Sequence, residues 1–167
     1  VSMHYHRRLR LPGLFLCLAV AACAASRATI RARAPIHELN VKEVVALKGY
    51  DPVAYFTDGK PVRGKAQIHY GWKGASWHFA SMDNRQRFIQ APEKYAPQYG
   101  GYCAYAIANG NIADVNPEHW AIVQDKLYLN NNVLAHTLWN VDQNGHIDAG
   151  NSNWQIAPRK PVSTTDN

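Results

Sequence analysis

The amino-acid sequence predicts an α+β domain in which a small antiparallel sheet is combined with several short helices. Two observations lead to this fold class. Aromatic and β-branched runs occur in closely spaced pairs at 68–79 and 121–129, as in β-hairpins. Around them, at 51–58, 81–95 and 133–141, lie short segments with helix-starting residues or helical spacing of apolar residues.

The first half of the domain is interpreted from its turn residues. Asp51 precedes Pro52, a residue favoured at the first position of a helix, so we expect Asp51 to cap a short helix over 53–56. The runs 68–72 and 76–79 are joined by a short turn that contains glycine, which predicts the first hairpin.

The second half begins with Ser81, whose side chain suits a helix N-cap, and the helix is expected to end at Pro92. The apolar run 102–108 fits either a helix or a buried strand. Apolar spacing predicts a last helix over 133–141, and we expect the polar segment 142–148 to form a turn after it. That segment lacks the glycine and glutamate of a calcium loop at the required places.

The N-terminal part of the chain predicts export. Arg7, Arg8 and Arg10 form a basic start, and 11–25 follow without a charge, as in a secretory signal peptide. This stretch is shorter than the roughly 20 apolar residues of a membrane-spanning helix. The expected organisation is a signal peptide at 1–23, an Ala/Arg-rich tether at 24–40, the folded domain at 41–156 and a flexible tail at 157–167.

Cys23 fits two processing outcomes. The sequence Val20-Ala21-Ala22-Cys23 is similar to a bacterial lipobox, in which the cysteine receives a lipid, but the neighbouring alanines also suit ordinary signal peptidase. The first outcome predicts a membrane-anchored lipoprotein and the second a periplasmic or secreted protein. Membrane contact is expected only through this lipid, and the sequence indicates no particular protein partner.

The charge distribution argues against nucleic acid as a partner. The chain has a formal net charge of +6, and the six arginines before residue 36 account for all of it. The predicted domain is therefore neutral, whereas nucleic-acid binding needs a basic face on the folded part.

Two motifs resemble the YHS domain family, specifically its exported members. They are Gly49-Tyr50-Asp51-Pro52-Val53-Ala54-Tyr55-Phe56 and Tyr99-Gly100-Gly101-Tyr102-Cys103-Ala104, and the similarity runs from about Leu47 to Trp154. The resemblance implies a YHS-like fold. Family members attached to metal-transporting pumps are thought to bind heavy metals through cysteines.

Those metal-associated members carry cysteines where this chain has Ala54, Ala80 and Asn84. Soft metal ions prefer thiolate ligands, so this kind of metal binding is not expected to carry over.

Cys103, His78 and Asp51 remain as candidate ligands of a transition-metal ion or a small polar molecule. Cys103 is the only cysteine of the predicted domain, and it is either a reactive thiol or a buried core residue. His78 faces His69 across the predicted hairpin if the register suits. Asp51 has its capping role as the structural alternative.

Three functions fit these residues. The first is an exported, non-catalytic binding domain for a transition-metal ion or a small polar ligand. The second is a thiol-dependent redox protein or enzyme that uses Cys103, although the sequence specifies no base for it. The third is a structural or interaction domain without a small ligand. Phosphate-loop, nucleophile-elbow and zinc-protease motifs are missing from the sequence, which favours binding over catalysis.

Overall fold

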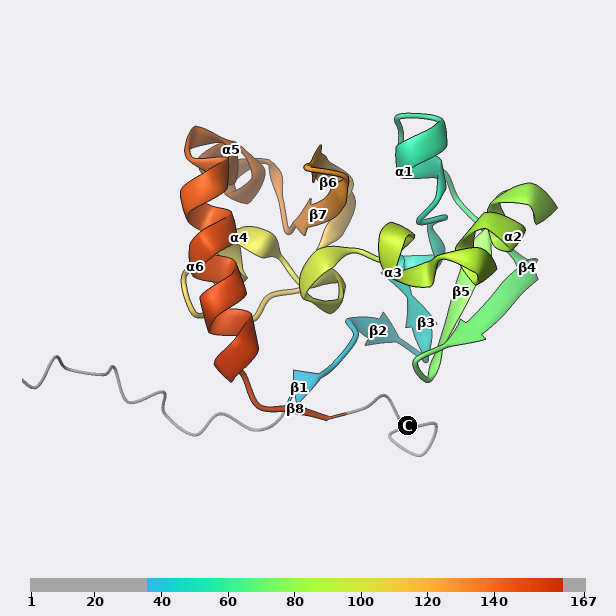
Figure 1. Ribbon diagram of the computed structural model, residues 1–167, viewed down its shortest axis with the longest axis horizontal. Helices are drawn as coiled ribbons and strands as arrows, with labels where there is room; N and C mark the ends of the chain where they lie inside the picture. The colour runs from blue at the N-terminus through green and yellow to red at the C-terminus, as the bar shows by residue number, and fades with distance from the viewer. Residues whose placement is uncertain (1–35, 161–167) are drawn as a thin grey trace, which may run out of the picture. The chain divides into compact units, whose positions relative to one another are not determined.

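The computed structural model describes residues 36–160, which form the predicted α+β fold (Figure 1). Its first half is built on a four-stranded sheet with the strand order β2-β3-β5-β4. Strands β4 and β5 form the predicted hairpin, and its turn residues Lys73 and Gly74 both have positive φ. The elements of this half are β1 (Ile36–His37), β2 (Val41–Lys42), β3 (Val45–Ala46), η1 (Leu47–Gly49), α1 (Ala54–Thr57), β4 (Lys65–Trp72) and β5 (Ala75–Phe79).

Helix α2 begins where the sequence predicts. The hydroxyl of Ser81 accepts the backbone N–H of Asn84 at 3.1 Å, which caps the helix. Pro92 then opens the next helix, because proline suits a first helical turn. The run 102–108, which fitted helix or strand, contains a short helix. The elements are α2 (Met82–Gln90), α3 (Pro92–Tyr95), η2 (Gln98–Gly101) and α4 (Ala104–Ala108).

The C-terminal part contains the second predicted hairpin and one helix more than expected. The segment 142–148 is not a turn, so that prediction is wrong. The carboxylate of Asp142 accepts the N–H of Gly145 at 2.9 Å and caps a helix. Asn153 donates two hydrogen bonds to carbonyls at the end of α4 and ties the same helix to the domain. The elements are β6 (Asn116–Val123), β7 (Lys126–Asn130), α5 (Val133–Val141), α6 (Gln143–Ile156) and β8 (Arg159–Lys160).

The sequence predicted an antiparallel sheet, but two of the strand pairs are parallel. Strand β3 runs parallel to β5, with Val45 opposite Ser76, and β1 pairs in parallel with β8. The β6–β7 hairpin forms a two-stranded sheet of its own. The parallel pairs join segments that are distant in the sequence, so local turn residues do not reveal them. Strands β1 and β8 lie within the stretches assigned above to the tether and the tail.

Two hydrophobic clusters fill the interior, and β7 contributes to both. Trp77 and Phe88 pack in the first cluster with ring centroids 5.0 Å apart, and Leu127 reaches it from β7. Tyr128, the next residue, points to the second cluster and packs there against Trp139. Figure 1 shows β7 next to the helices α4 and α5. Nine of the sixteen aromatic residues between 36 and 160 are therefore buried core residues.

The signal peptide, Cys23 and most of the tether and tail lie outside the described residues, and those assignments stay predictions. In the part from 36 to 160, no helix combines the length and the apolar character that crossing a membrane requires.

Candidate functional site

Asp51 is completely buried, and its carboxylate accepts three hydrogen bonds from the protein itself. Oδ1 accepts the N–H of Val53 at 2.8 Å. Oδ2 accepts the N–H of Ala80 at 2.8 Å and the side-chain amide of Asn84 at 2.7 Å. The bond to Val53 closes a turn just before α1. Val53 is the N-cap residue of that helix and no side chain caps it, so the expected capping role of Asp51 is wrong. A buried carboxylate needs such partners, so the contacts explain Asp51 without a ligand.

Cys103 is a buried core thiol and lies just before α4. Its Sγ is 3.7 Å from Oδ1 of Asn130, to which the thiol donates, and it accepts the N–H of Asn131 at 3.3 Å. The Asn130 amide is 3.5 Å from Nδ1 of His136. The exposed fraction of Cys103 is 1%. A reactive thiolate needs access to solvent, so this environment favours the structural alternative over the redox one.

His78 lies opposite His69 in the β4–β5 ladder, which confirms that the two residues face each other across the hairpin. Partial burial lowers the pKa of His78, and the nearby His69 lowers it further. Nδ1 of His69 is already 2.9 Å from the carbonyl of Ala66. Two imidazoles alone are an incomplete metal site.

Across residues 36–160, no group of three or more His, Cys, Asp or Glu side chains is placed to hold one metal ion. The structure therefore does not bring Asp51, His78 and Cys103 together around a metal. Their individual roles as ligands stay predictions.

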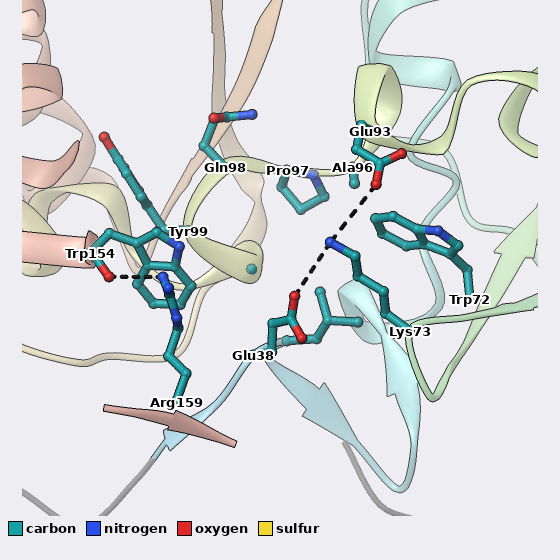
Figure 2. A pocket seen from close by; sticks show the side chains of 12 residues that line it. Glu38, Trp72, Lys73, Glu93, Ala96, Pro97, Gln98, Tyr99, Trp154 and Arg159 are labelled. Carbon is teal, nitrogen blue, oxygen red and sulfur yellow. Dashed lines mark hydrogen bonds and ion pairs between the residues drawn. The ribbon is translucent and has the colours of Figure 1, made fainter. Parts of the chain in front are cut away.

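A groove lined by aromatic and charged side chains lies between the β4–β5 turn and α6 (Figure 2). We call it the Trp72–Trp154 groove. Its volume is about 320 Å³, which suits a small molecule. Its lining residues are Glu38, Leu39, Trp72, Lys73, Glu93, Ala96, Pro97, Gln98, Tyr99, Gly100, Trp154 and Arg159.

On the hairpin side of the groove, Lys73 reaches between two carboxylates. Its Nζ is 3.3 Å from Oε1 of Glu38 and 3.9 Å from Oε1 of Glu93. The same ammonium lies 4.6 Å from the ring centroid of Trp72. Figure 2 shows Lys73 extended along Trp72 with its tip between the two acids. This arrangement combines an ion pair with a cation–π contact.

On the opposite side, Arg159 covers Trp154. Its guanidinium carbon is 4.8 Å from the ring centroid, and Nη1 donates to the Trp154 carbonyl at 2.8 Å. Tyr99 stands behind Trp154, with the ring centroids 6.1 Å apart. Burial raises the pKa of Tyr99, whose hydroxyl donates to the carbonyl of Ile147 at 3.2 Å. The tyrosine is therefore a neutral wall of the groove rather than an acid or a base.

Gly100 sets the floor of the groove. Its φ of +61° is the left-handed region that glycine favours, and a Cβ at this position would overlap the backbone carbonyl of Glu38. The carbonyl of Gly100 accepts the N–H of Asn40 at 2.8 Å. The close approach of these two segments places Glu38 at the edge of the groove.

Sequence reasoning did not single out the charged residues of this groove, because they come from separate segments around 38, 73, 93 and 159. Of its lining, only Tyr99 and Gly100 belong to a motif named above, the second motif of the family resemblance.

Residues 53–99 match the family model described as the YHS domain. No curated protein and no solved structure matches the chain significantly. The matched range includes Trp72, Lys73 and Glu93, whereas Trp154 and Arg159 lie beyond it. The matched region therefore contributes Trp72, Lys73 and Glu93 on the hairpin side, whereas Trp154 and Arg159 on the opposite side come from the C-terminal part.

Proposed function

Since the chain contains a YHS domain, we propose that it acts as an exported, non-catalytic binding domain that holds a small polar ligand in the Trp72–Trp154 groove. The observation that carries this proposal is the composition of the groove. Two aromatic walls face a cavity in which both carboxylates and cations are available. Ligand sites usually combine apolar walls with a few placed polar groups.

The contacts of Asp51 and Cys103 argue against a ligand at either residue, and this favours the groove as the binding site. The Asp51 carboxylate already accepts three hydrogen bonds, and Cys103 is buried with both of its polar contacts inside the protein. A metal ion would find no group of three suitable side chains between residues 36 and 160. These observations favour a small organic ligand over a metal ion.

A binding role is favoured over catalysis by the side chains in the groove. Within residues 36–160, no serine, cysteine or histidine lines the groove, and these are the usual nucleophiles and bases. The two carboxylates are paired with Lys73, and the Tyr99 hydroxyl is bonded to the protein. The carboxylates are 43% and 73% exposed, so they can exchange this pairing for polar groups of a ligand.

The proposal is tested by titrating the purified protein with amines, carboxylates, amino acids and sugars and recording backbone and indole N–H shifts by NMR. We expect at least one class to shift Trp72 and Trp154 in a saturable way. Glu93→Gln and Arg159→Gln should weaken this binding, because each removes a charge at the rim. Lys126→Gln, on the β6–β7 hairpin, is the control and should leave it unchanged. If none of the four classes of compound shifts the Trp72 and Trp154 signals, the proposal is overturned.

Export is tested separately. The intact mass of the protein from its native membrane and soluble fractions reports whether a leader has been removed and whether Cys23 carries a lipid. Protein that stays in the cytoplasm with its leader still attached would contradict the exported part of the proposal.

A further inference from the structure

Lys73 occupies a cage that has the composition of a binding site for an organic cation. The cage consists of Glu38, Glu93 and the face of Trp72, which lie 3.3 Å, 3.9 Å and 4.6 Å from the Lys73 ammonium. Two carboxylates and an indole face are groups that attract an alkylammonium ion. The ammonium group of Lys73 is thus itself an alkylammonium ion held by these three groups (Figure 2).

We propose that the Trp72–Trp154 groove recognises the ammonium group of an organic amine and that Lys73 is an internal competitor for the same place. The inference deepens the proposed function and rests on it, because it names the ligand class of the same groove. Lys73 then acts as an autoinhibitory contact that a ligand has to displace.

The walls of the cage are held without Lys73. The ring of Trp72 makes edge-on contacts with Trp77 and Phe88, at centroid distances of 5.6 Å and 5.7 Å. The indole N–H of Trp77 also donates to the Trp72 carbonyl at 3.1 Å. Glu38 is placed by the contact of its segment with Gly100. The aromatic face and the backbone that carries Glu38 therefore remain in position when the lysine leaves.

Lys73 itself is held weakly enough to be displaced. Its side chain is 38% exposed, and those of Glu38 and Glu93 are 43% and 73% exposed. Ion pairs this open to solvent contribute little to stability. Lysine has a flexible stem, so the ammonium can move into solvent while the backbone of the turn stays in place.

The charges around the cage select a cation over an anion. With Lys73 displaced, Glu38 and Glu93 leave two negative charges at that end of the groove. Arg159 is engaged on the other wall with the ring and the carbonyl of Trp154. A carboxylate entering the cage would be repelled, whereas an ammonium would restore the charge that Lys73 had supplied.

The experiment compares the wild type with Lys73→Asn and Lys73→Arg. Asparagine tolerates the positive φ of 50° at this position and is too short to fill the cage. The probe is propylammonium chloride, and binding is followed by the shift of the Trp72 indole N–H at low salt. Because an intramolecular competitor has an effective concentration in the millimolar range, its removal should tighten binding by about 10-fold. Lys73→Arg keeps a cation in place and should resemble the wild type.

Two further measurements fix the ligand class. Sodium acetate should not bind the Lys73→Asn protein, and adding Glu38→Gln to that variant should reduce propylammonium binding by about 3-fold. Thermal melts confirm that each variant is folded, and Lys73→Met serves as a second cage-emptying variant. No gain in propylammonium binding in either variant, or equal binding of acetate, overturns the inference.

The two proposals fail in different ways. If the wild type binds another ligand class at the groove but Lys73→Asn gains nothing for propylammonium, the inference is wrong and the proposed function stands. If Lys73→Asn gains propylammonium binding while the wild type binds nothing in the wider set of compounds, the cage is supported and the proposed function is contradicted.

Discussion

The carboxylate of Asp51 and the side-chain amide of Asn84 form a buried hydrogen bond of 2.7 Å. It connects the turn before α1 to the first turn of α2, and the N–H of Ala80 donates to the same oxygen at 2.8 Å. The resemblance to the metal-associated YHS proteins implies cysteines at the positions of Ala80 and Asn84. In this chain both positions donate a hydrogen bond to the Asp51 carboxylate, which gives this corner of the fold a structural role.

Replacing Asp51 by asparagine should destabilise the protein strongly. One oxygen would become an NH2 group, which cannot accept a hydrogen bond from the backbone and would face the N–H of Val53 or of Ala80. We expect a loss of about 2–4 kcal/mol in the free energy of unfolding, because a buried donor is left without its acceptor. Urea denaturation measures it.

Ser81→Ala is the matched control for this prediction. It removes one N-cap hydrogen bond at the same corner, from the N–H of Asn84, and should cost about 1 kcal/mol. If Asp51→Asn cost no more than Ser81→Ala, the carboxylate would not be the centre of this corner, and its contact with Asn84 would carry little energy.

Elements marked by local chemistry were predictable from the sequence. The Ser81 cap, the glycine-containing turn of the first hairpin and the alternating apolar runs all act within a few residues, and the elements they predict are present. Helix α6 was not predictable in this way, because its Asn and Gly residues favour a turn locally. It is stabilised by distant contacts, among them the close packing of Gly150 on Tyr99.

The candidate site was predictable only in part. The position of His78 opposite His69 followed from the hairpin register. The groove did not follow, because its charged residues are brought together by the packing of segments far apart in the chain. Such an arrangement depends on the parallel β1–β8 pairing and on α6, and neither leaves a local pattern in the sequence.

The thiol of Cys103 should be unreactive in the folded protein. It is 1% exposed, and its sulfur contacts Asn130 and Asn131. We expect an aromatic disulfide reagent to label it about 100-fold more slowly than in urea, because labelling requires local opening. Cys103→Ala should cost about 1–2 kcal/mol, since the N–H of Asn131 loses its partner. Labelling as fast as in urea would instead support the thiol-dependent alternative.

Stability should fall as the pH drops below the ordinary histidine range. Burial lowers the pKa values of His78 and His136, and His69 and His119 respectively lower them further. The unfolded chain therefore binds protons at a higher pH, near 6.5, than the folded protein does. This contribution to stability is complete above that pH and is lost as the pH falls toward the folded-state values.

The pH prediction is measured by urea denaturation between pH 8 and pH 5. The double variant His78→Gln/His136→Gln should show a smaller decrease over this range than the wild type. A wild-type protein that gained stability on acidification from pH 7 to pH 5 would show that the two histidines are better stabilised in their charged form, contrary to the burial of their rings.

Gly100→Ala should disrupt the floor of the groove. The new Cβ would overlap the carbonyl of Glu38, and the residue would also have to hold a φ of +61°. Gly59 has nearly the same φ, +62°, but nothing lies within 4 Å of its Cβ position. Gly59→Ala should therefore cost only the conformational strain, about 1 kcal/mol, whereas Gly100→Ala should cost at least about 3 kcal/mol in the free energy of unfolding.

The difference between these two variants isolates the contact with Glu38, because the backbone strain is common to both. Gly100→Ala should also shift the Trp72 indole N–H, since displacement of Glu38 changes the ion pair of Lys73 beside that ring. Gly59→Ala should leave this signal in place. Equal destabilisation by the two substitutions, with no shift at Trp72, would mean that the 38–40 segment does not rest on Gly100 and does not place Glu38 in the groove.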